Sequence, residues 1–383
     1  MFDLIISNAS IVDGTGGEAY RADIAVKGRT IASIGNLKDS PALRRVDAAG
    51  KTLCPGFIDV HSHADLSLFR DDYAATLSPL LRQGITTFVG GHCGIGLSPI
   101  TSQNREGLKT YLEAFAQMDF ERDIRWGGMA SFMDFVATRG LPLNMALLVP
   151  HGLLRICASG LNNRLLEKHE IQAMQRLLEE GLEAGAFGLS SGLQYAPGLN
   201  ADTEELVELS RPLERYQGIH ASHIRSYTSS TLPQAIGEIG EISRRAGIHG
   251  HIAHIFSVPW TGPFQDLALK GLKWLANHAE TAMRLVPRPL IDMEMKRILG
   301  LLEKERRAGA EITMDIMPTT VGFTHLLAFF PPWALVGGQA EVIRKIRDKT
   351  TRAAIRRDIE TGKPTWPHRG RNTWSLNIIR QMG

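Results

Sequence analysis

Residues 50–65, GKTLCPGFIDVHSHAD, mark the point where the character of the chain changes. A short apolar segment, 56–60, is followed at once by His61, Ser62 and His63. Alternation along an extended chain points both imidazoles to the same side, about 6–7 Å apart at their Cα atoms, which suits two ligands of one metal ion. Because an isolated His-x-His pair is more often an ordinary loop feature, the rest of the chain decides its meaning.

Upstream of this stretch, residues 3–53 alternate between apolar and polar positions in short segments such as LIISNASIVD, ADIAVKG and TIASIG. Gly, Asp and Asn separate these segments, which is the pattern of small antiparallel strands. We assign residues 1–54 to the N-terminal part of a small β-sandwich.

Downstream, short apolar strands alternate with amphipathic helices, which predicts βαβ units and a parallel sheet. We expect a TIM-like (β/α)8 barrel over residues 55–383, with 318–383 forming a lid-like insertion and a tail. Helices are predicted at 164–184, 232–246, 268–283 and 340–358. Seven strands are found, at 56–60, 85–90, 144–149, 186–189, 218–222, 250–253 and 311–315.

Length and composition agree with this division. The 383 residues suffice for one barrel of about 250 residues and a smaller domain. Hydrophobic residues make up 43% and charged residues 22%, as in ordinary globular proteins, and the net charge is only +3. We find no basic run that would bind nucleic acid and no apolar segment that would target or cross a membrane, so we expect a cytoplasmic protein.

Three further side chains follow predicted strands at the same end as His61 and His63. Cys93 follows the second strand, His223 the fifth and His254 the sixth. In a barrel that end is the catalytic face, and ligands of one ion have to converge there. Cys93 would otherwise be a buried small hydrophobic residue, but the glycines around it, at positions 90, 91 and 94, indicate that something approaches the backbone closely.

The other histidines are weighed by their place on the strands. His151 follows the third strand on the same face, and we expect it to bind substrate rather than metal. His92 points away from Cys93 if the strand continues, so we interpret it as a packing or supporting residue. Three more precede strand ends and are interpreted as ordinary core or surface residues; they are His220, His249 and His251.

At this point the sequence resembles a known family. The segment at 50–65 resembles the opening of the amidohydrolase superfamily. Later blocks resemble, in order, those of the N-acyl-D-amino-acid deacylases, or D-aminoacylases, along essentially the whole chain. These blocks are QGITTFVGGHCGIGLSPI (83–100), VPHGLLR (149–155), GAFGLSSGLQYAPG (185–198), ASHIRS (221–226), MDIMPTT (314–320) and PPWALVGG (331–338).

The resemblance implies hydrolysis of the amide bond of N-acyl-D-amino acids, giving a carboxylate and a free D-amino acid. It implies one or two zinc ions, which polarise the amide carbonyl and activate water. Tyr195 is implied as a substrate contact, and we add His151 and Arg225 as substrate-binding candidates. The implied metal ligands are His61, His63, Cys93, His223 and His254.

Three positions depart from the family pattern around the substrate. Phe256 stands where the family tends to carry a lysine, and Thr319 stands where a tyrosine follows Pro. Tyr227 replaces an acidic residue after the fifth strand, which changes the charge around Arg225. These departures leave the amino acid and acyl preference open.

The family pattern also continues beyond this chain with an eighth strand that ends in a Ser-Asp-Gly-like aspartate. Asp315 lies in a different motif, so we assign no general base and expect a truncated product. A barrel without its last strand would leave two strand edges unpaired, which favours self-association.

Two alternatives remain open. One is a cyclic amidase of the hydantoinase or dihydroorotase type, which normally bridges its metals with a carbamylated lysine on the fourth strand; GAFGLSS has no lysine. The other is a catalytically inactive, metal-binding homologue.

Overall fold

A computed structural model describes residues 1–116, 118–162, 164–227, 229–256, 288–317, 330–335 and 338–361. The chain divides into two compact units. The first comprises residues 1–58 with 82–87, and the second comprises 59–81 with 88–383.

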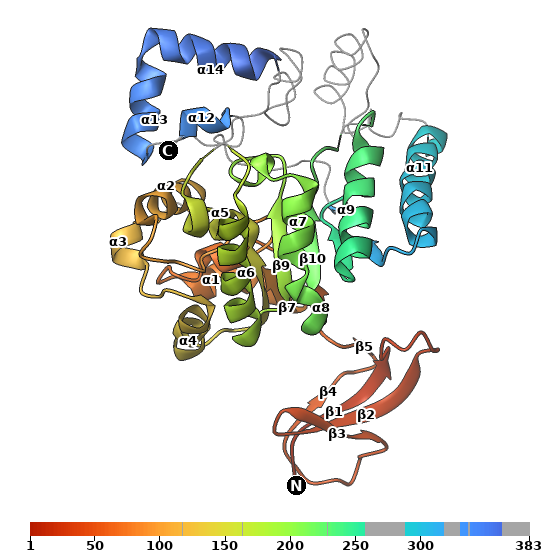
Figure 1. Ribbon diagram of the computed structural model, residues 1–383. Coiled ribbons are helices and arrows are strands. Elements are labelled where there is room, and N and C mark those ends of the chain that lie inside the picture. Colours follow the sequence, from red (N-terminus) through yellow and green to blue (C-terminus); the bar gives the residue numbers. More distant parts are fainter. Residues whose placement is uncertain are drawn as a thin grey trace, which may run out of the picture. The chain divides into compact units, whose positions relative to one another are not determined.

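The first unit contains one five-stranded sheet, with the central order β3, β2, β1, β4 (Figure 1). β1 pairs antiparallel with β2, and β2 with β3. The purely antiparallel pattern predicted here is wrong for the other two strands, because β4 and β5 both pair parallel with β1. Ile5 and Ala25 are fully buried in its core. The strands are β1 (Phe2–Ile11), β2 (Tyr20–Lys27), β3 (Thr30–Gly35), β4 (Ala42–Asp47) and β5 (Thr52–Leu53).

The larger sheet has seven strands in the order β12, β11, β10, β9, β8, β7, β6, so its spatial order follows the sequence. The pairs from β8 to β12 are parallel. This is the arrangement of a β/α barrel, and it confirms the predicted fold class. The strands are β6 (Phe57–Asp59), β7 (Ile85–Gly90), β8 (Asn144–Pro150), β9 (Gly188–Gly192), β10 (Ile219–His223), β11 (His249–Ile252) and β12 (Ile312–Met314).

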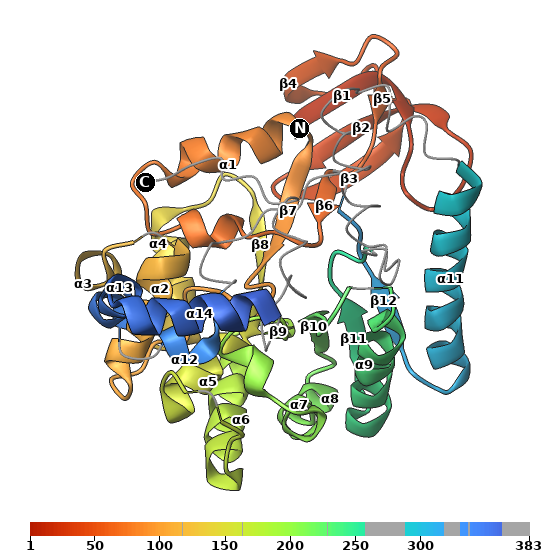
Figure 2. The same cartoon turned by 90° about the horizontal axis from the view of Figure 1, so that it is seen from above.

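Helices lie along the outer side of these strands (Figure 2). α6 (Lys168–Glu183) and α9 (Leu232–Ala246) lie close to the predicted spans, and α9 ends at Gly247 in the left-handed conformation, a common C-terminal signal. Their apolar faces pack into one continuous core with the strands. The other helices are α1 (Tyr73–Arg82), α2 (Arg105–Ala116), α3 (Phe120–Asp123), α4 (Met129–Arg139), α5 (His151–Ser159), α7 (Thr203–Ser210), α8 (Pro212–Arg215) and α11 (Arg288–Arg307), with short 3₁₀ turns at Ala64–Ser67 and Gly198–Asn200.

Towards the C-terminus the described chain forms α12 (Pro332–Leu335), α13 (Gly338–Arg347) and α14 (Lys349–Thr361). The single basic helix predicted at 340–358 is therefore wrong: the helix is interrupted at Asp348, whose carboxylate accepts a hydrogen bond from the Thr351 backbone N–H and begins a new helix. The helix predicted at 268–283, Thr319 and most of the proposed lid and tail lie outside the described residues. No helix in the described part of the chain is long and apolar enough to cross a membrane.

Candidate metal centre

The five side chains proposed as ligands come together at the carboxyl ends of four strands. His61 and His63 follow β6, Cys93 follows β7, His223 ends β10, and His254 follows β11. They form two groups that share the thiol, namely His61, His63 and Cys93, and Cys93, His223 and His254. Within each group the ligand atoms lie within 4.8 Å of one another, so each can face a single ion.

Cys93 occupies the centre because the chain turns sharply after β7. Its own φ is +57°, and Gly91 and Gly94 have φ of +73° and +69°, a conformation that glycine adopts without steric cost. A Cβ on Gly91 would lie 2.2 Å from the Leu148 carbonyl oxygen, and one on Gly94 would lie 2.8 Å from the Gly192 nitrogen. The close approach that the glycines predicted is therefore made by the neighbouring strands β8 and β9.

The thiol of Cys93 faces imidazole nitrogens. Its Sγ lies 3.4 Å from His61 Nε2 and 3.5 Å from His254 Nε2. Burial would raise the pKa of Cys93, but the charge of His254 and hydrogen bonds from His223, His254 and His61 hold that pKa well below its usual value. The sulfur is therefore present as thiolate, which is the form that binds metal.

The imidazoles around the thiolate have divergent pKa values. Burial would lower the pKa of His61, but hydrogen bonds to Asp315 and Cys93 raise it to about 10. Burial and the charge of His254 lower the pKa of His223 to about 4. Without metal, His61 thus keeps a proton beside the thiolate, and an ion that binds at Nε2 displaces that proton.

Asp315, which the sequence did not place in the site, lies against the ligands. It follows β12, and its Oδ2 is 2.9 Å from His61 Nδ1 and 2.9 Å from His251 Nε2. Its Oδ1 accepts a hydrogen bond from the backbone N–H of His254. Although burial opposes it, the hydrogen bonds from His251 and His61 hold the pKa of Asp315 well below its usual range, so the group is a carboxylate.

His92 packs directly on the site. Its ring stacks on that of His61, with centroids 4.1 Å apart and an interplanar angle of 17°. The side chain is 1% exposed, and neither ring nitrogen has a hydrogen-bond partner in the described structure. Burial lowers the pKa of His92 to about 3, so it is a neutral ring beside His61, and the packing role remains a prediction that this placement supports.

Aromatic residues border the ligands. The Tyr195 hydroxyl donates to the Cys93 carbonyl oxygen, and its ring lies edge-on to His223 with centroids 5.1 Å apart. Tyr227 stacks on Phe256 at 4.3 Å and 6°, and its hydroxyl donates to the Ala253 carbonyl. Two positions that depart from the family pattern, 227 and 256, therefore form one aromatic stack beside the site.

His151 and Arg225 are held by carboxylates. His151 Nε2 lies 2.9 Å from Glu205 Oε1, and the side chain is fully buried at the start of α5. Arg225 bonds through Nε and Nη2 to Glu238, and through its remaining N–H groups to the backbone carbonyls of Leu199 and Ala201. The Arg225 bonds fix the loop that carries Tyr195, and the His151 bond ties α5 to α7; whether either residue also binds substrate stays a prediction.

Two further side chains could not be identified from strand positions. Gln194 Oε1 lies 2.6 Å from His223 Nε2, and the amide nitrogen of Gln194 is buried without a hydrogen-bond partner in the described structure. His251, interpreted as an ordinary core or surface residue, contacts Asp315. A motif does not reveal either contact, because each depends on how neighbouring strands are staggered.

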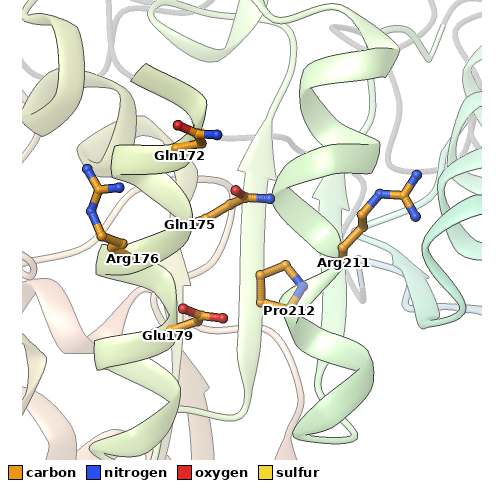
Figure 3. Close-up of a pocket in the computed structure, with 6 residues that line it drawn as sticks. All are labelled: Gln172, Gln175, Arg176, Glu179, Arg211 and Pro212. Carbon is orange, nitrogen blue, oxygen red and sulfur yellow. The ribbon is translucent and has the colours of Figure 1, made fainter. Parts of the chain in front are cut away.

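A hollow of about 420 Å³ lies elsewhere, on the outer surface between α6 and the α7–α8 junction (Figure 3). None of its lining residues belongs to either ligand group. We attach no chemistry to it. The lining residues are Gln172, Gln175, Arg176, Glu179, Arg211 and Pro212.

With this geometry in view, the chain was compared with known proteins. No protein-family model matches it. It is 36% identical over 253 residues to a D-aminoacylase of Alcaligenes xylosoxydans xylosoxydans. The aligned residues make up 66% of this chain and 50% of that protein. It is 34% identical over 252 residues to the N-acyl-D-glutamate deacylase of the same organism, 66% of this chain and 49% of that protein. The chain is a homologue of the N-acyl-D-amino-acid deacylases.

Solved structures agree with this relationship. A Bordetella bronchiseptica N-acyl-D-glutamate deacylase, complexed with zinc and a phosphonate mimic of the tetrahedral intermediate, superposes with a TM-score of 0.67 at 30% identity, over 83% of this chain and 59% of that one. A D-aminoacylase superposes with a TM-score of 0.65 at 29% identity, over 93% and 70%. This chain thus has the amidohydrolase barrel fold. It spans about half the length of the curated relatives that it matches.

Proposed function

We propose that this protein is a metal-dependent amidohydrolase that cleaves the amide bond of N-acyl-D-amino acids and releases a carboxylate and a free D-amino acid. The observation that carries the proposal is a buried cysteine sulfur shared by two groups of imidazoles at the carboxyl ends of barrel strands, in a homologue of the N-acyl-D-amino-acid deacylases. A cyclic amidase is less favoured, because residues 185–192, which include β9, contain no lysine that could bridge two metal ions.

The donor set fits zinc. Zinc takes tetrahedral nitrogen and sulfur ligands, and a thiolate selects it over the hard ions that prefer oxygen. We propose that one or two zinc ions bind to His61, His63, Cys93, His223 and His254. About one zinc ion per chain would be held tightly. When bound, the ion would polarise the amide carbonyl and lower the pKa of water.

The substrate would lie against the aromatic side chains at the mouth of this cluster. We propose that Tyr195 contacts it directly, and that His151 and Arg225 act mainly by holding the loop around Tyr195. Phe256 is half-buried, stacks on the fully buried Tyr227 and borders His254, so its ring is the apolar part of this stack that a substrate side chain could touch. We therefore expect N-acyl derivatives of D-methionine or D-leucine to be better substrates than those of D-glutamate.

The free thiols support a proposal for the compartment. Cys54, Cys93 and Cys157 are all free, and a thiolate ligand persists best where thiols are kept reduced. We propose a cytoplasmic enzyme.

The test is an assay of N-acetyl-D-methionine hydrolysis against its L enantiomer, before and after chelation and zinc restoration. The assay uses the 383-residue chain and the same chain extended by the corresponding part of D-aminoacylase, because the chain spans about half of that relative. We expect D-selective, zinc-dependent hydrolysis in the extended protein and a rate at least roughly 1000-fold lower in the chain alone, since we assign no general base among its described residues.

Two variants complete the assay. Cys93→Ala in the extended protein should abolish the zinc-dependent rate, whereas Cys157→Ala, which removes another buried free cysteine, should retain it. Zinc binding without hydrolysis in either protein would indicate an inactive homologue, and hydrolysis of a hydantoin in preference to the linear amide would favour the cyclic amidase.

A further inference from the structure

The Asp315 carboxylate lies where three segments of the barrel meet. It contacts the side chain of His61 after β6, the side chain of His251 on β11 and the backbone N–H of His254. The side chain of Asp315 is 10% exposed. Among the described residues, its ion-pair partners are the histidines His61 and His251 rather than a lysine or arginine, so its charge is directed at the ligand cluster.

The contact with His61 has a definite direction. Asp315 bonds to Nδ1 of the ring, whereas the opposite nitrogen, Nε2, lies 3.4 Å from Cys93 Sγ. A carboxylate can only accept, so Nδ1 must carry the proton. With the proton on Nδ1, Nε2 is the nitrogen that faces the thiolate. The Nε2 lone pair is therefore the one that an ion would bind.

Backbone hydrogen bonds hold Asp315 in place beside His61. Its N–H donates to the Ile252 carbonyl, and its carbonyl accepts from the Ile255 N–H, so both sides of the residue are tied to the segment that carries His254. β12 and β6 are the two end strands of the seven-stranded sheet. The hydrogen bond between His61 and Asp315 therefore connects the proposed ligand that follows β6 to the residue that follows β12.

We propose that Asp315 is a positioning residue for metal binding: it orients His61 and keeps the proton on Nδ1, so that Nε2 faces the ion. The inference rests on the metal site of the proposed function and not on the substrate. It differs from a direct ligand or a general base, because the Asp315 side chain reaches a ligand ring only at His61; its bond from the backbone N–H of His254 goes to an oxygen that remains an acceptor in Asp315→Asn.

The experiment is a zinc titration of the 383-residue chain against a chromophoric chelator. The His61→Ala variant is titrated first. The zinc affinity that this variant changes is the one to which His61 contributes. Asp315→Asn should weaken that same affinity by about 10- to 100-fold, which is typical for loss of a carboxylate behind a ligating histidine. Glu311→Gln, which neutralises an exposed carboxylate just before the same strand, should leave it unchanged.

The double variant separates positioning from direct ligation. In a His61→Ala background, Asp315→Asn should have no further effect on zinc affinity, because the residue through which it acts is gone. An unchanged affinity in Asp315→Asn, or a further loss in the double variant, would overturn the proposal. Because the readout is zinc, a chain that binds zinc as expected but hydrolyses no N-acyl-D-amino acid would refute the enzyme function and leave the role of Asp315 intact.

A measurement on the unaltered chain covers the case in which Asp315→Asn does not fold. Nitrogen-15 spectra of the histidine rings in the metal-free protein should show His61 with a proton on Nδ1, in either the neutral ring or the imidazolium. A neutral His61 with its proton on Nε2 alone would overturn the proposal.

Discussion

Two clusters of buried ionisable side chains lie in the larger unit, and they differ in how their charges are balanced. In the first, Glu205 accepts from His151 at 2.9 Å and from Arg155 at 3.0 Å, and all three side chains are at most 2% exposed. In the second, the Cys93 thiolate faces several imidazoles whose nitrogens converge on it. The first cluster is complete in charge within the protein, although His151 Nδ1 has no hydrogen-bond partner among the described residues; the second gathers donor atoms around a common point.

The difference explains why position on a strand is not enough to identify a ligand. His151 follows β8 on the same face of the barrel as the proposed ligands, yet Glu205 already occupies its Nε2. Both rings keep a buried Nδ1 without a hydrogen-bond partner in the described structure, but the Nε2 of His254 faces the Cys93 sulfur instead of a carboxylate. Converging lone pairs stay together only if a cation or protons lie between them, so the second cluster is the one that a metal ion would stabilise.

The largest effect that would break this comparison is loss of the shared thiolate. A structural zinc site contributes roughly 10–16 kcal/mol over about four ligands, so removing Cys93 should weaken zinc binding by roughly 70- to 900-fold. We expect Cys93→Ala to lose its zinc on dialysis, measured by elemental analysis. Cys157→Ala, which alters a cysteine that is also 3% exposed, should keep it. Equal zinc contents in the two variants would remove Cys93 from the ligand set.

The reciprocal change targets the complete cluster. Glu205→Gln leaves Arg155 buried and without a neutralising charge, which typically costs about 3–5 kcal/mol of stability. Urea unfolding of the metal-free protein should show this loss, while the zinc content of the folded variant stays unchanged. Glu208→Gln on the same helix breaks only an exposed pair with Arg211 and should cost less than about 1 kcal/mol. A loss of zinc in Glu205→Gln with little destabilisation would reverse the roles of the two clusters.

Much of the barrel could be predicted from its sequence. β7 and α9 occupy the predicted residues, and the five proposed ligands lie together, because strand ends in a parallel barrel face one way regardless of loop detail. β9 was predicted at 186–189 but spans Gly188–Gly192. Its Gly188, Ser190 and Ser191 are small or polar residues that carry no apolar signal, although all are buried.

The supporting contacts could not be predicted in the same way. The sequence places Asp315 in a different motif from the expected aspartate, and its hydrogen bond to His61 joins positions 254 residues apart. Such a contact depends on the curvature that brings the ends of β6 and β12 together. The parallel pairing of β4 was missed for a related reason, since register across a sheet is set by tertiary packing.

A smaller effect tests the link between the ligand cluster and its surroundings. Tyr195→Phe removes the hydrogen bond to the buried Cys93 carbonyl and should cost about 1–2 kcal/mol of stability. If the hydroxyl also contacts substrate, turnover in the extended protein should fall further than zinc affinity does. Thermal unfolding, zinc titration and kinetics on one preparation distinguish the two roles, and unchanged turnover would remove Tyr195 from the substrate site.

The smallest expected effect lies at the outer edge of the complete cluster, where Arg155 also donates to the Arg164 carbonyl at 2.8 Å. The Arg164 guanidinium pairs with Glu170 at 2.6 Å; its side chain is 48% exposed, whereas that of Glu170 is 7% exposed. Although burial opposes it, the hydrogen bond from Arg164 lowers the pKa of Glu170 from 4.5 to about 2.

Because the folded-state pKa of Glu170 is depressed, the folded protein binds fewer protons than the unfolded chain between these two values. The stability that Glu170 contributes is therefore fully present above about pH 4.5 and is lost as the pH falls towards 2. Solvent around Arg164 limits it to about 1 kcal/mol. Urea unfolding from pH 6 to pH 3 should show Glu170→Gln less stable than the parent at pH 6, with the gap narrowing as the pH falls. Glu180→Gln, an exposed carboxylate on the same helix, should show no such gap. A gap that is constant with pH would mean that Glu170 stabilises α6 through its neutral hydrogen bonds alone.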